Sequence, residues 1–100
     1  DTHWLLKQGE EIGTHTHAYL QALLKSRSFP EQAYRSCLGV LSLARKYSHP
    51  MFETACERAL HAHLLSYKEL KAELEALARR FAVPVQPLVH ENIRGETYFN

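Results

Sequence analysis

The sequence predicts an all-α domain, a small bundle or short array of about five antiparallel helices followed by an extended C-terminal tail. Apolar residues recur at helical spacing in successive segments of residues 1–82. Capping residues, glycines and prolines separate these segments. A chain of 100 residues with 45% hydrophobic and 23% charged residues is long enough for one soluble domain and too short for two. We therefore expect a helical domain over residues 1–82 and a separate tail over residues 83–100.

The first helix is expected close to the N-terminus. Trp4, Leu5 and Gln8 fall on one helical face, and Gly9 or Gly13 is suited to end the helix. Tryptophan carries a large apolar surface, so we expect Trp4 to be a buried anchor that covers one end of the bundle.

A second helix is expected from Thr14 to about Ser26, after a turn at Ile12-Gly13-Thr14. The Thr14 hydroxyl is suited to accept a hydrogen bond from the unpaired amides of the first turn. We expect Tyr19 near the edge of the buried face. The inward residues are expected to be three leucines, namely Leu20, Leu23 and Leu24.

The third helix follows a start signal at Ser28-Phe29-Pro30-Glu31. Ser28 and Glu31 have the spacing of a capping box, and Pro30 stands where no amide donor is needed. The predicted apolar stripe consists of Tyr34, Cys37, Leu38, Leu41, Ala44 and Tyr47.

The fourth helix begins after Tyr47-Ser48-His49-Pro50, where Pro50 disfavours a helical conformation at His49 and Ser48 is a good N-cap. Its predicted stripe consists of Phe52, Ala55, Cys56, Ala59 and Leu60. The connection is short, so we expect the third and fourth helices to lie back to back with their stripes buried against each other. Cys37 and Cys56 are interpreted as small buried hydrophobic residues.

The fifth helix is predicted from a second capping box, Ser66 with Glu69, to about Phe81. Only a short polar break separates it from the fourth helix, so we expect these two helices to pack antiparallel. Its apolar stripe consists of Tyr67, Leu70, Leu74, Leu77, Ala78 and Phe81.

The last stretch differs from the rest because Pro84 and Pro87 exclude a helix, so residues 83–89 are expected to form an extended, polyproline-like strap. Residues 90–100 have neither a helical nor a strand period. They are either a disordered terminus or a short recognition peptide. In the second case Ile93 would be an apolar anchor, and Arg94 would donate to a carboxylate or phosphate.

Five pieces of the sequence, in this order, resemble a known family. They are Ile12-Gly13-Thr14-His15-Thr16, then PEQAYRSCLGVLSLARKY, then E-x-A-C-E-R-A-L, then S-Y-K-E-L-K, and finally His90-Glu91-Asn92-Ile93-Arg94-Gly95 with Tyr98 and Phe99 behind it. The chain resembles the C-terminal helical region of the IstA-type transposases of the insertion-sequence-21 family, within the DDE integrase-like superfamily. Ser48, in place of an expected glycine, and Thr97 depart from the family pattern.

The resemblance implies a function in DNA transposition, with catalysis in one domain of the transposase and other functions in another. The three acidic residues that hold the catalytic metal ions would lie in an upstream domain, so this chain is expected to be a non-enzymatic fragment without a cofactor. The partners implied are the AAA+ ATPase of the same element or other transposase protomers, with DNA reached through the full-length protein. The expected partner-binding residues are His90, Glu91, Asn92, Ile93, Arg94, Gly95, Tyr98 and Phe99.

An alternative is a module that contacts DNA directly. From Lys25 to Arg58 six basic residues stand against three acidic ones, although the formal net charge of the chain is only +1. A mildly basic helical face would bind phosphates and give a salt-dependent affinity. The candidate phosphate contacts are Arg27, Arg35, Arg45, Lys46 and Arg58.

Other chemistry finds little support in the sequence. His15 and His17, and likewise His61 and His63, are two residues apart, which on a helix turns them away from each other. Because no H-E-x-x-H pair, Gly-rich phosphate loop or G-x-S-x-G turn occurs, we expect neither a metal site nor a catalytic nucleophile. The sequence also contains no apolar run of membrane-spanning length, and we expect a cytoplasmic protein that does not bind membranes.

Overall fold

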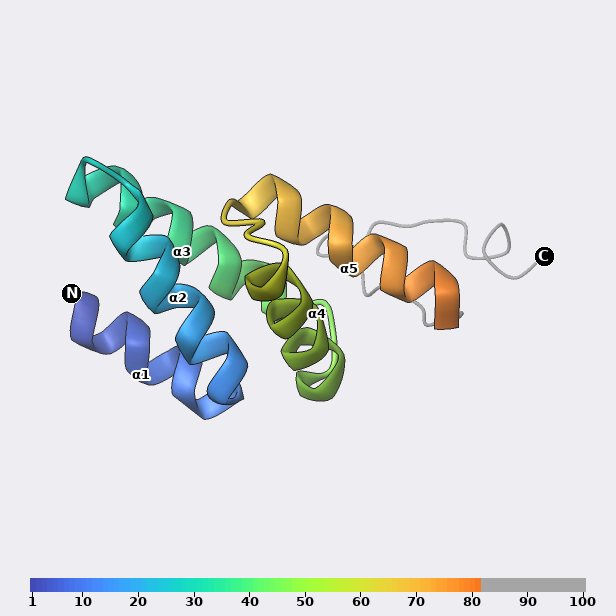
Figure 1. Ribbon diagram of the computed structural model, residues 1–100. Coiled ribbons are helices and arrows are strands. Elements are labelled where there is room, and N and C mark those ends of the chain that lie inside the picture. The colour runs from blue at the N-terminus through green and yellow to red at the C-terminus, as the bar shows by residue number, and fades with distance from the viewer. Residues whose placement is uncertain (82–100) are drawn as a thin grey trace, which may run out of the picture.

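The computed structural model describes residues 1–81, which form five α-helices and no strand. In order, the helices are α1 (Thr2–Ile12), α2 (Thr14–Ser26), α3 (Pro30–Ala44), α4 (His49–His61) and α5 (Tyr67–Phe81) (Figure 1). The predicted all-α class and the number of helices are confirmed. The strap and tail predicted for residues 83–100, and the domain boundary before them, lie outside the described residues. No helix within residues 1–81 is long and apolar enough to cross a membrane.

Helix α2 is at the centre of the packing, because it contacts α1, α3 and α4 (Figure 1). Helix α5 packs against α4 and also against α3. Within the described residues α3 and α4 scarcely touch each other, so the predicted back-to-back pair is wrong. A short connection limits the distance between two helix ends, but it does not determine which face of each helix is buried or which helix covers it. Both helices turn their buried faces toward α2 instead.

The two cysteines mark this arrangement. Cys37 Sγ lies 3.9 Å from the carbonyl oxygen of Leu20, and Cys56 Sγ lies 3.7 Å from Thr16 Oγ1, so they contact different turns of α2. Both are buried free thiols. Burial raises the pKa of Cys37 to about 11 and that of Cys56 to about 12, so both are protonated at neutral pH. They are the small buried residues that the sequence predicts.

The buried face of α3 differs from the predicted one. Leu38 is 39% exposed, and Tyr34 and Leu41 are only partly buried. The buried residues are Ala33, Cys37, Val40, Leu43, Ala44 and, just past the helix end, Tyr47. Apolar residues cover more than half of the circumference of α3, so their periodicity does not determine which part faces the core. The predicted stripe of α4 is confirmed, with Leu60 partly buried.

Three helix starts also differ in detail from the prediction. Phe29, in extended conformation, is the N-cap of α3, because Pro30 takes the first helical position and restricts the residue before it. Gly13 rather than Thr14 is the N-cap of α2. His49, which was expected outside, is the first residue of α4.

Two predicted caps are confirmed. Ser48 Oγ accepts a hydrogen bond from the amide of Met51 at 3.2 Å at the start of α4. At the start of α5, Ser66 Oγ accepts from the Glu69 amide at 3.1 Å, and its hydroxyl donates to Glu69 Oε1 at the same distance.

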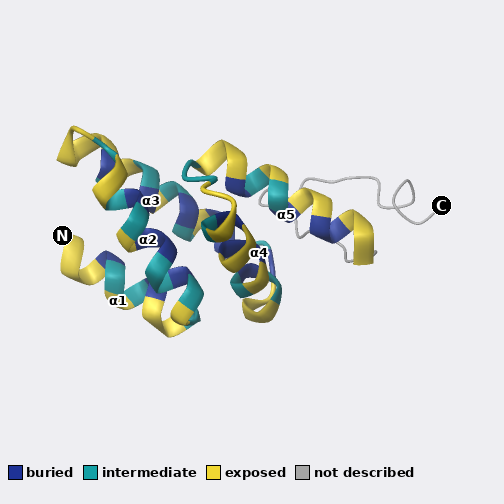
Figure 2. Ribbon diagram, in the orientation of Figure 1, coloured by how far each residue is buried: buried dark blue, intermediate teal, exposed yellow. Residues whose placement is uncertain are grey.

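Four aromatic residues occupy unexpected environments. Tyr19 is completely buried rather than at the edge, and its hydroxyl donates to the Leu64 carbonyl at 2.6 Å and accepts from the Ser66 amide at 3.1 Å. It thereby ties the α4–α5 connection to α2, and its burial raises its pKa. Trp4, Tyr67 and Phe81 were expected in the core but are exposed. Figure 2 shows that exposed positions predominate in the last turn of α5.

Candidate interaction surface

The N-terminus of α2 is capped by a carboxylate from α4. Glu53 Oε1 accepts a hydrogen bond from the His15 amide at 3.0 Å, and Glu53 Oε2 accepts from the Thr16 amide and the Thr16 hydroxyl, both at 2.7 Å. Unpaired amides and the helix dipole both favour a negative charge at this end of a helix. Burial acts to raise the pKa of Glu53, but these hydrogen bonds together outweigh it and hold the pKa below its ordinary value.

Gly13 makes this contact possible, because a Cβ at this position would collide with the Glu53 carboxylate. The Ile-Gly-x-x-Thr piece and the E-x-A-C-E piece of the resemblance therefore meet in space, through Gly13 and Thr16 on one side and Glu53 and Cys56 on the other. A similar contact joins two further pieces, since a Cβ at Gly39 would lie 3.2 Å from the Tyr67 ring. At these positions the motif residues hold helices together, which accounts for them without a ligand.

A groove lies between α1 and α3, which run in the same direction (Figure 1). At its N-terminal end the α-ammonium of Asp1 donates to the Tyr34 hydroxyl at 2.7 Å. The groove has a volume of about 290 Å³. It is lined by Trp4, Gln8, Glu11 and Ile12 from α1, by Leu41, Ala44 and Arg45 at α3, and by His49 of α4.

The groove is apolar at its centre and charged at one end. Trp4 is 47% exposed, and Leu38, on the same side of α3 as Leu41, continues the apolar surface. Glu11 and Arg45 are exposed, and within residues 1–81 neither takes part in an ion pair. An exposed apolar patch bordered by polar and charged residues is typical of protein-binding surfaces. The sequence pattern predicts Trp4, Leu38 and Leu41 in the core, whereas the structure places them at this surface.

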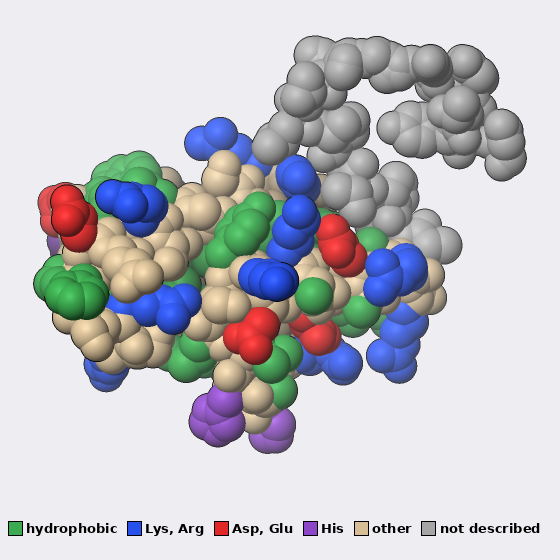
Figure 3. Space-filling model, turned by 90° about the horizontal axis from the view of Figure 1, so that it is seen from above, with side chains coloured by type: hydrophobic (Ala, Val, Ile, Leu, Met, Phe, Trp, Pro, Cys, Tyr) green, Lys and Arg blue, Asp and Glu red, His purple; other side chains and the backbone are tan. Residues whose placement is uncertain are grey.

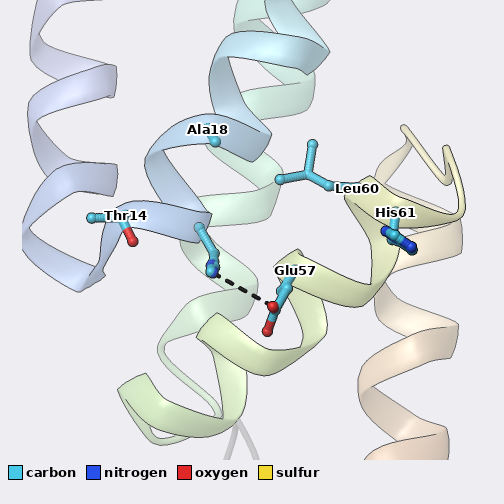
Figure 4. Close-up of a pocket in the computed structure, with 6 residues that line it drawn as sticks. Thr14, Ala18, Glu57, Leu60 and His61 are labelled. Atoms are coloured by element: carbon cyan, nitrogen blue, oxygen red, sulfur yellow. Dashed lines mark ion pairs between the residues drawn. The ribbon is translucent and has the colours of Figure 1, made fainter.

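A second, more open hollow lies between the start of α2 and the last turns of α4 (Figure 4). Its volume is about 440 Å³, and it is lined by Thr14, His15, Ala18, Glu57, Leu60 and His61. His15 Nε2 lies 3.8 Å from Glu57 Oε2, close enough for an ion pair when the imidazole is protonated. Within the described part of the chain no three His, Cys, Asp or Glu side chains come close enough together to hold a metal ion.

The five basic residues predicted as phosphate contacts occupy different environments. The Arg27 guanidinium donates to the Leu65 carbonyl at 3.3 Å, and Arg58 forms an ion pair with Glu73. Arg35 and Arg45 are exposed on α3 and at its end, and Lys46 is half-buried beyond it. Figure 3 shows a row of Lys and Arg side chains across the middle of one face, with acidic side chains close by.

The predicted partner-binding residues of the tail, from His90 to Phe99, lie outside the described residues. Within residues 1–81 the structure therefore has a groove between α1 and α3 and a hollow between α2 and α4. A third, smaller hollow at α1 and α2 is lined by His3, Leu6, Lys7, Glu10 and His17.

Comparison with known proteins identifies relatives over almost the whole chain. One is a protein named as the transposase for insertion sequence IS408 in Burkholderia multivorans, which is 38% identical over 96% of this chain. Another, named as the transposase for insertion sequence IS1162 in Pseudomonas fluorescens, is 36% identical over 95% of the chain. A third, named as transposase y4uI in Sinorhizobium fredii, is 31% identical over 93%. No family model and no solved structure matches the chain.

The matched part is a minor share of each relative, since the chain spans only 18 to 20% of their lengths. The resemblance to insertion-sequence transposases that the sequence motifs indicate is confirmed by these relatives.

Proposed function

Since this chain is homologous to a segment of the transposases of bacterial insertion sequences, we propose that it is a non-catalytic protein-interaction module of such a transposase. Its partners are the AAA+ ATPase of the same element or other transposase protomers. The contact is made through the groove between α1 and α3, together with the tail.

The observation that carries this proposal is the exposure of Trp4 beside the apolar centre of the groove. A tryptophan that is 47% exposed, next to Leu41 and Ile12 and with Leu38 nearby, leaves a large apolar surface in water. Aromatic anchors in such grooves are the residues that most often dominate binding energy in protein interfaces. Burial of this surface by a partner would remove it from water and stabilise the complex.

The contacts of two carboxylates within the described residues support a non-catalytic role. Glu53 accepts three hydrogen bonds from the start of α2, and Glu73 is paired with Arg58. Both are occupied with interactions that hold helices together, so neither is available for the paired metal ions on which nucleic-acid-cleaving sites depend.

The environments of the five basic residues predicted as phosphate contacts favour a protein partner over DNA. Arg27 and Arg58 have intramolecular partners, and Arg45 lies at the groove. Phosphate binding to DNA needs several cations on a shared face, because each neutralised phosphate adds to the affinity. Of the predicted set, this leaves Arg35, which is exposed, and Lys46, which is half-buried. Neither has an intramolecular partner within residues 1–81 or lines the groove.

The test is binding of the 100-residue chain to the ATPase of the same element, measured with ATP and DNA present, for the wild type and two alanine variants. We expect Trp4→Ala to weaken binding at least about tenfold. Phe29→Ala is the matched control, because Phe29 is 68% exposed and does not line the groove, and it should bind like the wild type.

Equal affinity of the wild type and Trp4→Ala would contradict the use of the groove. A parallel titration with DNA alone tests the alternative. Tight DNA binding that falls steeply with salt, combined with no affinity for the ATPase, would replace our proposal with a DNA-contacting module.

A further inference from the structure

The two helices that form the groove, α1 and α3, are parallel, and this limits the geometry of a partner that fills it. Both helices run in the same direction, with Asp1 beside Tyr34 at one end and Ile12 near Arg45 at the other. The early turns of α1 therefore lie beside the early turns of α3, and the last turns of the two helices lie beside each other. Helix α2 covers the opposite side of both helices, so the groove is the open side of a three-helix layer.

The charges at the end of the groove are complementary to each other. Glu11 and Arg45 both line the groove. Glu11 is in the last turn of α1 and Arg45 is the C-cap of α3, so in two helices that run in the same direction they lie at the same end of the groove (Figure 1). Within residues 1–81 neither has an ion-pair partner. A surface that carries one acid on one helix and one base at the same level of the neighbouring helix is complementary to itself under a two-fold rotation.

We propose that the groove binds a second copy of this chain, with a two-fold axis running along the groove. Such a rotation places α1 of one copy against α3 of the other and preserves the direction of all four helices. Glu11 of each copy then faces Arg45 of the other copy, and each Trp4 lies against Leu38 and Leu41 of the other. The result is a four-helix arrangement that closes the open side of both layers.

This inference rests on the proposed function, since it names the partner that occupies the same groove. The contact is small, because α1 has 11 residues and is only ~16 Å long. Interfaces at the lower end of the size range are weak and transient in isolation. The dimer is therefore concentration-dependent in the 100-residue chain, and attachment to a longer protein would raise the effective concentration of one copy around another.

The primary experiment is sedimentation equilibrium of the 100-residue chain over a wide concentration range, from about 1 μM to about 1 mM. The expected result is a mass that rises from the monomer value of 11.5 kDa toward twice that value. Trp4 is the only tryptophan, so its fluorescence should shift to shorter wavelength over the same concentrations as it leaves water.

Charge reversal gives the decisive test of the two-fold geometry. Glu11→Arg and Arg45→Glu should each weaken dimerisation about tenfold or more, because each places like charges opposite one another twice. The double variant Glu11→Arg with Arg45→Glu should restore it. Glu10→Arg is the matched control, because Glu10 is exposed on the same helix and lines a different hollow, so the dimer should be unaffected.

A monomer at every concentration, or a double variant that fails to recover, overturns the inference. The proposed function is judged separately by the ATPase titration. Loss of ATPase binding by Trp4→Ala in a strictly monomeric chain would support the groove as a site for a different protein while rejecting the dimer. A dimer that responds to charge reversal as expected, with ATPase binding unchanged in Trp4→Ala, would support the second copy and reject the ATPase as an occupant of the groove.

Discussion

Glu53 shows how a single side chain replaces a local cap with a tertiary one. The residue that precedes α2 is Gly13, which has no side chain to accept hydrogen bonds from the first amides of the helix. Glu53 supplies that acceptor from α4, 38 residues further along the chain than His15. The Glu53 carboxylate can approach the start of α2 only because Gly13 has no side chain.

We predict that Glu53→Gln destabilises the fold by about 1–2 kcal/mol at pH 7. The pKa of Glu53 is lowered in the folded protein, so its ionised form stabilises the fold above the ordinary value of 4.5. This contribution is lost as the pH falls through the lowered folded pKa. The difference between wild type and Glu53→Gln, measured by urea unfolding from pH 7 down to pH 3, should therefore shrink toward zero at the acid end.

Two variants serve as controls for this prediction. Glu10→Gln removes an exposed carboxylate without a partner in residues 1–81 and should change stability little at any pH. Gly13→Ala pushes a methyl group against the same Glu53 carboxylate, so its cost should not add to that of Glu53→Gln in the double variant. A Glu53→Gln effect that stays constant from pH 7 to pH 3 would refute the role of the charge.

At the level of helices, periodicity and punctuation predict which segments are helical, and the structure agrees with all five. The faces are harder to predict. Helix α3 carries one apolar stripe through Cys37 and Val40 and a second through Leu38 and Leu41, and only contact with α2 selects the first for the core. The pairing of α3 and α4 also depends on contacts between distant residues, which sequence spacing does not contain.

The same limit applies to the candidate site. The residues of the groove were visible as apolar helix positions, but their exposure depends on α2 covering only one side of α1 and α3. The Glu53 cap was not predictable from spacing either, because its partners are 37 and 38 residues away. Its only sequence signal was a glycine and a threonine where a helix begins, which also fits an ordinary turn.

The choice of face in α3 is tested by two leucine substitutions on one helix. Leu43 is 2% exposed, so Leu43→Ala should cost about 2–5 kcal/mol through lost burial and the cavity left behind. Leu38 is 39% exposed, so Leu38→Ala should cost less than about 1 kcal/mol, in contrast to the core role expected from the sequence. The measurement is urea unfolding of both variants, and similar losses of stability would show that the assigned face is wrong.

Residues 1–81 form an elongated array with dimensions of 44 × 26 × 23 Å, in which α1 and α5 lie at opposite ends (Figure 1). An elongated arrangement of a short chain leaves more helix faces without a neighbour than a closed bundle does. The exposed apolar residues are accordingly spread over α1, the start of α3, its middle and both ends of α5. This shape suits a module whose remaining faces are completed by other proteins.

The tail provides the last prediction at this scale. Within the described residues the core cluster runs from Leu5 to Ala78 and draws on all five helices. We predict that deletion of residues 90–100 leaves the far-UV circular dichroism and the unfolding midpoint nearly unchanged. If the tail is a recognition peptide, the same deletion should weaken binding to the ATPase at least about tenfold, and Arg94→Ala should weaken it by a smaller factor. Calorimetric titration checks the binding, and a large loss of helical signal in the deletion would instead make the tail part of the fold.

Because Trp4→Ala and the tail deletion change different parts of the chain, their effects on the free energy of binding should add if groove and tail contact the ATPase independently.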